Sequence, residues 1–144
     1  MIRSFQPHDA ERVMELWLEG NWDAHPFIPK SYWTSCAPQV RGQLPRAEVY
    51  VYESGGKIQG FAGMQGDCLA GIFVDRRHRS AGIGKQLLDH IKKRHPAFTL
   101  HVYRRNRRAL GFYLREGLSV LGQGVDEDTG EQDMTMKWSG RCEL

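Results

Sequence analysis

The chain has 144 residues, of which 40% are hydrophobic and 26% are charged, and its formal net charge is +3. This length predicts a single domain over residues 1–144, with a folded core over 2–138 and a short tail over 139–144. The chain contains no run of roughly twenty apolar residues and no signal-peptide core, so we expect a cytoplasmic protein without a membrane partner. Three widely spaced cysteines without a metal-ligand pattern favour reduced thiols and predict no metal site.

Hydrophobic periodicity and turn residues predict a mixture of strands and helices. We expect Gly20 to end the first helix, Pro38 to bend or break the second, and the acidic run at 126–131 to form an exposed hairpin turn. Residues 141–144 are expected to fray. The predicted elements in chain order are a strand at 2–5, a helix at about 9–18, a loop at 21–30, a helix at 31–42, strands at 48–53, 57–65 and 68–74, a helix at 82–94, a strand at 98–103, a helix at 106–116, and strands at 118–125 and 132–138.

Residues 72–85 combine a strand, an arginine-bearing glycine turn and the start of an amphipathic helix. The small residues at 80–84 let the main chain approach a ligand closely, and the helix start offers unpaired N–H groups to phosphate oxygens. The segment therefore predicts an anion cradle. By itself, the same pattern is also consistent with an ordinary helix N-terminus after a glycine turn.

Positive charge is concentrated around this turn. Residues 76–108 contain eleven Lys or Arg residues and one acid, so the rest of the chain is net negative. Such a segment suits a ligand with several phosphate charges, such as coenzyme A. Nucleic acid is a less favoured partner, because no aromatic residues interleave Arg104, Arg105, Arg107 and Arg108 as a base-stacking surface requires. A solvated basic face is the remaining alternative.

A second motif follows at residues 106–118, which read Asn-x-x-Ala-x-x-Phe-Tyr-x-x-x-Gly-Leu. Asn106 is a typical N-cap and Gly117 a typical helix stop. Together with Arg-x-x-Gly-x-Gly at 79–84, this motif resembles the two signatures of the GNAT superfamily of acyl-CoA-dependent acetyltransferases. Leu118 stands where the family usually has an aromatic residue, and both residue types fill a core. The resemblance extends over residues 2–138.

The resemblance implies an α+β fold, with a central, mostly antiparallel mixed sheet and about four helices. In the family, the strands that correspond to 68–74 and 98–103 are parallel and splay apart, and the pantetheine amides of coenzyme A bind the unpaired backbone between them. The implied activity is acetyl-CoA-dependent transfer of an acetyl group to a primary amine, by direct attack in a ternary complex. The acceptor is a protein lysine, a protein N-terminus or a small amine, and the enzyme acts as a monomer or homodimer.

The implied cofactor-binding residues lie on the strand before the glycine turn, in the turn itself and in the second motif. They are Ile72, Phe73, Val74, Arg79, Ser80, Ala81, Gly82, Ile83, Gly84, Lys85, Asn106 and Phe112.

Tyr113 matches the tyrosine that serves many family members as the general acid for the departing thiolate, and a phenol is protonated at neutral pH. His101 stands where some relatives that acetylate N-termini carry a glutamate base, and a neutral imidazole can accept a proton. A chain of water molecules is an equally serious candidate for the base, followed by Asp67, His25 and Glu48. We expect a backbone N–H of residues 72–74 to stabilise the oxyanion.

A run of large side chains at 22–33 predicts the acceptor site, because the family places a variable helix and loop there. The residues expected to bind the acceptor are Trp22, His25, Phe27, Tyr32 and Trp33, with Ile28 beside them. The alternative is that about half of them simply fill the core. His25 is not expected to bind a metal, because no partner stands at zinc-binding spacing.

A non-catalytic acyl-CoA-binding or sensing domain is the main alternative from a different class, and in it Tyr113 would only pack. Release of coenzyme A in the presence of amines distinguishes the enzyme from this alternative. A basic nucleic-acid-binding module, in contrast, predicts an affinity that falls steeply with salt.

Overall fold

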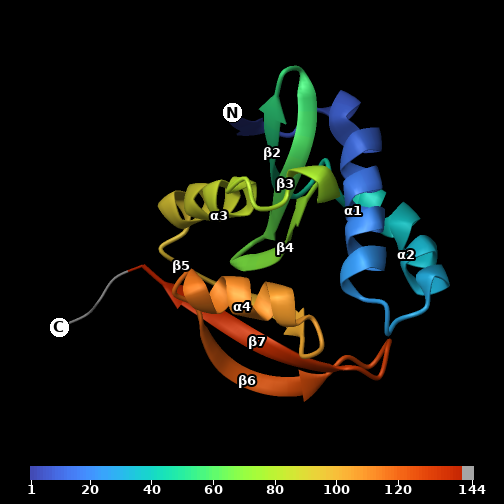
Figure 1. Cartoon of the computed structure of the whole chain (residues 1–144), viewed down its shortest axis with the longest axis vertical. Helices are drawn as coiled ribbons and strands as arrows, with labels where there is room; N and C mark the ends of the chain where they lie inside the picture. The colour runs from blue at the N-terminus through green and yellow to red at the C-terminus, as the bar shows by residue number, and fades with distance from the viewer. Residues whose placement is uncertain (141–144) are drawn as a thin grey trace.

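The structure, a computed structural model, describes residues 1–140 and is built around one seven-stranded sheet (Figure 1). Every neighbouring pair of strands is antiparallel except β4 and β5, which confirms the expected mixed sheet. The strands, in their order across the sheet, are β1 (Ile2–Ser4), β2 (Glu48–Ser54), β3 (Lys57–Gln65), β4 (Cys68–Val74), β5 (Ala97–Tyr103), β7 (Gln132–Ser139) and β6 (Ser119–Val125). The expected fraying of 141–144 lies outside the described residues.

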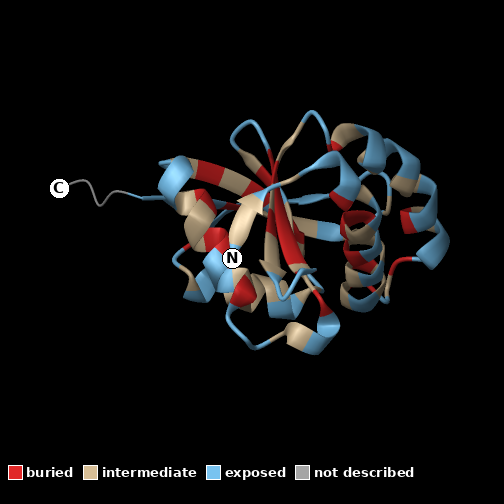
Figure 2. Ribbon diagram, turned by 90° about the horizontal axis from the view of Figure 1, so that it is seen from above, coloured by how far each residue is buried: buried red, intermediate tan, exposed pale blue. Residues whose placement is uncertain are grey.

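Helices cover both faces of the sheet, and the buried residues lie between them and the strands (Figure 2). One core cluster joins α3 (Ile83–Arg94) and α4 (Arg107–Arg115) to the sheet, and the other joins α1 (Ala10–Ala24) and α2 (Lys30–Gln43) to the opposite face. Alternation along β2 follows from the pleat, since Val49 and Val51 enter one cluster while Tyr50 and Tyr52 pack against the other. None of the helices within residues 1–140 is long and apolar enough to cross a bilayer.

Helix α1 continues to Ala24, so the prediction that Gly20 ends it is wrong. A Cβ built on Gly20 would lie only 2.7 Å from Cδ1 of Phe73 on β4. The glycine therefore lets the helix pass closely over the sheet. As a consequence, Trp22 lies on the helix and not in the predicted loop.

Helix α2 runs without interruption across Pro38, so the proline does not break it. Proline lacks the N–H that would bond to the carbonyl of Thr34. Both residues are exposed, so water can satisfy the freed carbonyl.

Strands β4 and β5 diverge soon after they meet. Their pairing is limited to Cys68 with Thr99 and Leu69 with Leu100. The register between β3 and β4 shifts at Ala70, which is a bulge at the point where the divergence begins. Beyond it, the facing backbones of β4 and β5 share no ladder, as the resemblance implied. Unpaired backbone groups at this opening are available to a ligand.

Candidate active site

A cavity of about 1040 Å³ occupies the opening between β4 and β5, and we call it the main cavity. Its walls come from α1, the loop before α2, β4, the turn before α3, β5 and α4. Most of the residues predicted from the sequence meet here: Ile72, Phe73, Val74, Arg79, Ser80, Gly82, Ile83, Gly84, Lys85, His101, Asn106, Phe112, Tyr113, His25, Phe27 and Trp33. Ala81, Trp22 and Tyr32 do not line it.

The turn before α3 has the backbone that an anion cradle needs. Gly82 is the N-cap of α3, with φ of 80°, and Ser80 has φ of 73°, so both adopt left-handed conformations. The first N–H groups of α3 have no partner inside the helix, and they carry the positive end of its dipole. A short 3-10 helix, η2 (Arg76–His78), leads into this turn. The cradle therefore fits the pyrophosphate of coenzyme A.

Two residues that were predicted to bind the cofactor form ion pairs with acidic residues of this chain. Nη1 of Arg79 lies 2.5 Å from Oδ2 of Asp23 on α1, and this hydrogen bond lowers the pKa of the Asp23 carboxyl. Nζ of Lys85 lies 3.0 Å from Oε1 of Glu116. Both cations therefore link the cradle to neighbouring helices, although both residues also line the cavity.

Three arginines that were not predicted to bind the cofactor also line the main cavity. Arg107 and Arg108 stand in the first turn of α4, and Arg115 stands in its last turn. Within residues 1–140, Arg107 and Arg108 form no ion pair, so their charges are available to phosphate groups. The excess of positive charge over residues 76–108 was the signal that pointed to them.

Tyr113 lies on α4, is 7% exposed and belongs to the core cluster beneath α3. Its ring packs edge to face against Phe112, with centroids 5.2 Å apart. Burial raises the pKa of the Tyr113 phenol above its ordinary value. The side chain is therefore both a packing residue and a protonated group on the cavity wall.

The structure separates the candidates for the general base. His101 is exposed on β5, and its Nδ1 lies 3.2 Å from Oγ1 of Thr135 on β7, so it can meet an incoming amine. Glu48 and Asp67 do not line the cavity; both lie beside His95, at 3.1 Å and 3.7 Å from its ring nitrogens. These two carboxylates are therefore poorly placed for proton transfer to the cavity.

His25 is buried within an aromatic cluster. Its ring stacks on Trp33 with centroids 5.2 Å apart and meets the edges of Tyr103 and Phe27 at 5.0 Å and 5.7 Å. Nε2 of His25 lies 3.2 Å from Nδ2 of Asn106. Because Oδ1 of Asn106 already accepts the Ala109 N–H, Nδ2 is the donor and the histidine nitrogen accepts. Burial lowers the pKa of His25 to about 4, so it is a neutral, structural group at physiological pH.

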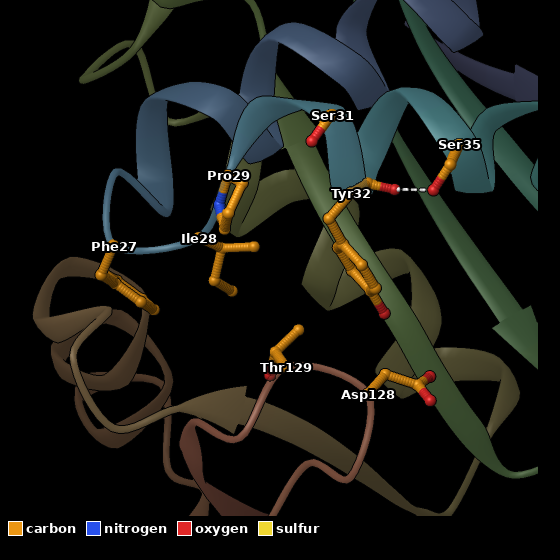
Figure 3. A pocket seen from close by; sticks show the side chains of 8 residues that line it. All are labelled: Phe27, Ile28, Pro29, Ser31, Tyr32, Ser35, Asp128 and Thr129. Carbon is orange, nitrogen blue, oxygen red and sulfur yellow. Dashed lines mark hydrogen bonds between the residues drawn. The ribbon is translucent and has the colours of Figure 1, made fainter.

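Of the other predicted acceptor residues, Phe27 and Trp33 line the main cavity, whereas Trp22 and Tyr32 lie outside it. The indole N–H of Trp22 donates to the Lys30 carbonyl at 3.3 Å, and Nζ of Lys30 lies 5.3 Å from the ring centroid. Tyr32 instead lines a second pocket of about 540 Å³ between α2 and the turn at residues 126–131 (Figure 3). This second pocket was missed, because the acidic run alone indicated only an exposed turn. Its full lining is Phe27, Ile28, Pro29, Ser31, Tyr32, Ser35, Asp128 and Thr129.

The fold and the cavity together define an acetyl-transfer enzyme. A model of the acetyltransferase (GNAT) domain matches residues 45–117, which include β4, the cradle, β5 and α4. The chain therefore belongs to the GNAT acetyltransferase family, as its two motifs indicated. It is an N-acetyltransferase, and acetyl-CoA is its cosubstrate.

Two relatives are similar in sequence to almost the whole chain. Peptidyl-lysine N-acetyltransferase YiaC of Escherichia coli (strain K12) is 37% identical over 140 residues, which cover 96% of each chain. Peptidyl-lysine N-acetyltransferase YjaB of the same organism is 28% identical over 131 residues, or 90% of this chain and 89% of YjaB.

Solved structures show the same fold. The solution structure of apo-form YjaB from Escherichia coli covers 98% of each chain, with a TM-score of 0.85 at 26% identity. PaiA N-acetyltransferase from Thermoplasma acidophilum, solved in complex with coenzyme A, covers 96% of this chain and 98% of its own, with a TM-score of 0.77 at 19% identity.

Proposed function

We propose that this enzyme transfers the acetyl group of acetyl-CoA to the ε-amino group of lysine residues in proteins. The observation that carries the proposal is the main cavity, which joins the phosphate-adapted cradle to Tyr113 and to the exposed His101. The choice of lysine over other amines is supported by YiaC and YjaB, which are both named peptidyl-lysine N-acetyltransferases.

The proposed reaction forms a bond between the amine nitrogen and the acetyl carbonyl carbon, and it breaks the bond from that carbon to sulfur. Tyr113 donates its phenolic proton to the departing thiolate, since a phenol is protonated at neutral pH. The proton lost by the amine passes to His101 or to a water molecule. A backbone N–H of residues 72–74, on the strand edge without a ladder partner, stabilises the oxyanion.

The cradle and the neighbouring arginines hold the phosphate groups of acetyl-CoA in this proposal. The N–H groups that start α3 bind the pyrophosphate, and Arg107 and Arg108 supply positive charge beside it. The free backbone between β4 and β5 binds the pantetheine arm.

Release of free thiol from acetyl-CoA tests the proposal against its alternatives. The substrates are a peptide with one lysine and a blocked N-terminus, the same peptide with a free N-terminus and an acetylated lysine, and a small amine. We expect thiol release and one added acetyl group only for the lysine peptide. Release at the rate of spontaneous hydrolysis with every amine would support a non-catalytic acyl-CoA-binding domain instead.

We also propose that residues 1–144 act as one catalytic domain in the cytoplasm, where acetyl-CoA is available and thiols stay reduced. Cys36 and Cys68 are free thiols in the part of the chain that the structure describes, which supports this location. Fractionation of cells that express the protein, followed by detection of the protein in each fraction, checks the proposal.

A further inference from the structure

The second pocket lies between the first turns of α2 and the turn that joins β6 to β7, and we call it the turn pocket. We propose that the turn pocket binds a cationic side chain, lysine or arginine, of the acceptor protein close to the lysine that is acetylated. This inference rests on the proposed lysine acetyltransferase function and names the sequence context that the enzyme prefers.

The turn pocket and the main cavity are adjacent. Phe27 lines both of them. Tyr103, at the end of β5, lines the main cavity. Its hydroxyl donates a hydrogen bond to Oδ2 of Asp126 in the β6–β7 turn at 2.5 Å and so connects the cavity wall to the turn. A peptide segment whose lysine enters the main cavity therefore has neighbouring residues within reach of the turn pocket.

The acidic residues of the β6–β7 turn differ in whether their carboxylates have partners. Asp126 accepts the Tyr103 hydroxyl and the Asp128 backbone N–H, and Glu131 lies 3.7 Å from Nε of Arg105. The Asp128 carboxylate, in contrast, forms no ion pair or hydrogen bond within residues 1–140. It lines the turn pocket, so an uncompensated negative charge faces the space.

The walls of the turn pocket suit the stem and the head of a basic side chain. Figure 3 shows the Tyr32 ring reaching from α2 toward Asp128 and Thr129, with Phe27 and Ile28 across the space. The guanidinium of Arg105 already lies over the Phe27 ring, 5.4 Å from its centroid. The Tyr32 ring and the Asp128 carboxylate therefore attract the incoming cation, while the apolar atoms of the pocket contact its methylene groups.

The titration of Tyr32 agrees with a negative potential in this pocket. Burial is the main cause that raises the pKa of Tyr32 to about 12, and the carboxylates of Asp126 and Asp128 act in the same direction. A potential that disfavours a phenolate favours a bound cation. An acidic or phosphorylated side chain is correspondingly a poor occupant.

Matched peptides test the inference. Each peptide has a blocked N-terminus and one acetylatable lysine, and at each position near that lysine one series carries arginine where the other carries glutamine. The readout is the ratio of kcat/KM for the arginine peptide to that for the glutamine peptide. For the wild type we expect a ratio of roughly five to ten at one position, which is the scale of a partly exposed ion pair with an aromatic contact.

Asp128→Asn should bring this ratio close to one, since it removes the charge and keeps the shape of the side chain. Glu127→Gln is the matched control, because it removes one charge from the same turn at an exposed residue that does not line the turn pocket. The control should keep the wild-type ratio. Thermal unfolding of both variants checks that the fold is intact.

Three results would overturn the inference. A wild-type ratio near one at every position removes the cation preference but leaves lysine acetylation standing. If Asp128→Asn and Glu127→Gln lose the preference for arginine equally, the preference comes from the overall negative charge of the turn and not from the turn pocket. Absence of acetyl transfer to any lysine peptide overturns the proposed function and this inference together.

Discussion

At the scale of single residues, Tyr113 belongs both to the core and to the wall of the main cavity. Its ring fills the core cluster beneath α3. A phenol held by core packing keeps a fixed orientation, and a phenol carries its proton at neutral pH. Both properties agree with the proposed role of Tyr113 as the general acid.

Replacing Tyr113 with phenylalanine removes the proton donor and keeps the ring. We expect kcat to fall roughly 10²-fold, the usual scale for a lost general acid, while the dissociation constant of acetyl-CoA stays unchanged. Thiol release measures kcat, and calorimetry measures binding. Full turnover by Tyr113→Phe would show that the thiolate takes its proton from water. His101→Ala provides a comparison, because loss of a base removes the acidic limb of the pH profile.

His25 joins the loop before α2 to the start of α4 through Asn106. The Asn106 amide caps α4 by accepting the Ala109 N–H, and it donates to the neutral imidazole. His25 therefore acts through position and not as a base. Its folded-state pKa of about 4 lies below the usual value, so the folded protein prefers the neutral form.

This preference predicts a specific dependence of stability on pH. Above the unfolded pKa of about 6.5 the stabilising contribution of neutral His25 is complete, and it is lost as pH falls through 6.5 toward the folded value of about 4. His25→Phe keeps an aromatic ring and removes the titration. We expect this variant to be less stable than the wild type near neutral pH, by about 1 to 2 kcal/mol for a lost buried hydrogen bond. Urea unfolding at several pH values should show that gap narrowing toward pH 4, and a constant gap would contradict the prediction.

At the scale of elements, the start of α3 forms the cradle because its backbone comes close to the ligand space. Gly82 needs its left-handed conformation, whereas a Cβ on Gly84 would meet Phe112 and Val74 at ordinary distances of 3.6 Å and 3.9 Å. Gly84 therefore accepts a side chain without unfolding the helix.

Gly84→Ala and Gly84→Asp form a matched pair that separates packing from charge. Both variants should fold, because the added Cβ has space. We expect Gly84→Asp to abolish detectable acetyl-CoA binding, since a carboxylate in the first turn of α3 repels phosphate, and Gly84→Ala to weaken binding far less. Calorimetric titration gives both affinities. Normal affinity in a folded Gly84→Asp variant would remove the cradle assignment.

At the scale of the whole molecule, charge is divided between two regions. Residues 76–108 carry most of the positive charge, and the β6–β7 turn carries acidic residues, of which Glu131 lies 3.7 Å from Nε of Arg105. This division suits a reaction between a polyanionic donor and a cationic acceptor. It also predicts that added salt weakens the binding of acetyl-CoA.

Raising the ionic strength from about 0.01 M to 0.15 M shortens the Debye length from about 30 Å to 8 Å. We expect the KM for acetyl-CoA to rise several-fold over this range with little change in kcat. Acetyl-dephospho-CoA, which lacks the 3′-phosphate, should show a weaker dependence. A KM that does not respond to salt would mean that the basic segment does not contribute to binding.

Most of the fold could be predicted from the sequence, because strand and helix patterns are set by nearby residues. The hairpin of β2 and β3, the crossover from β4 through α3 to β5, and both motifs appear where local spacing placed them. The errors arose where distant contacts decide the outcome. Helix α1 continues through Gly20, which lies against Phe73 of β4. The place of β7 between β5 and β6 was not predicted, and it too depends on pairing between residues far apart in the sequence.

The sequence by itself determined the family, the cradle and the identity of the residues around Tyr113, because their motifs depend on short-range backbone geometry. Only the tertiary structure decided how their side chains are used. Arg79 is paired with Asp23 across 56 residues of sequence, and His25 with Asn106 across 81. The turn pocket likewise exists only because α2 packs beside the β6–β7 turn. Partners so far apart along the chain are brought together by the packing of whole elements, which local spacing does not encode.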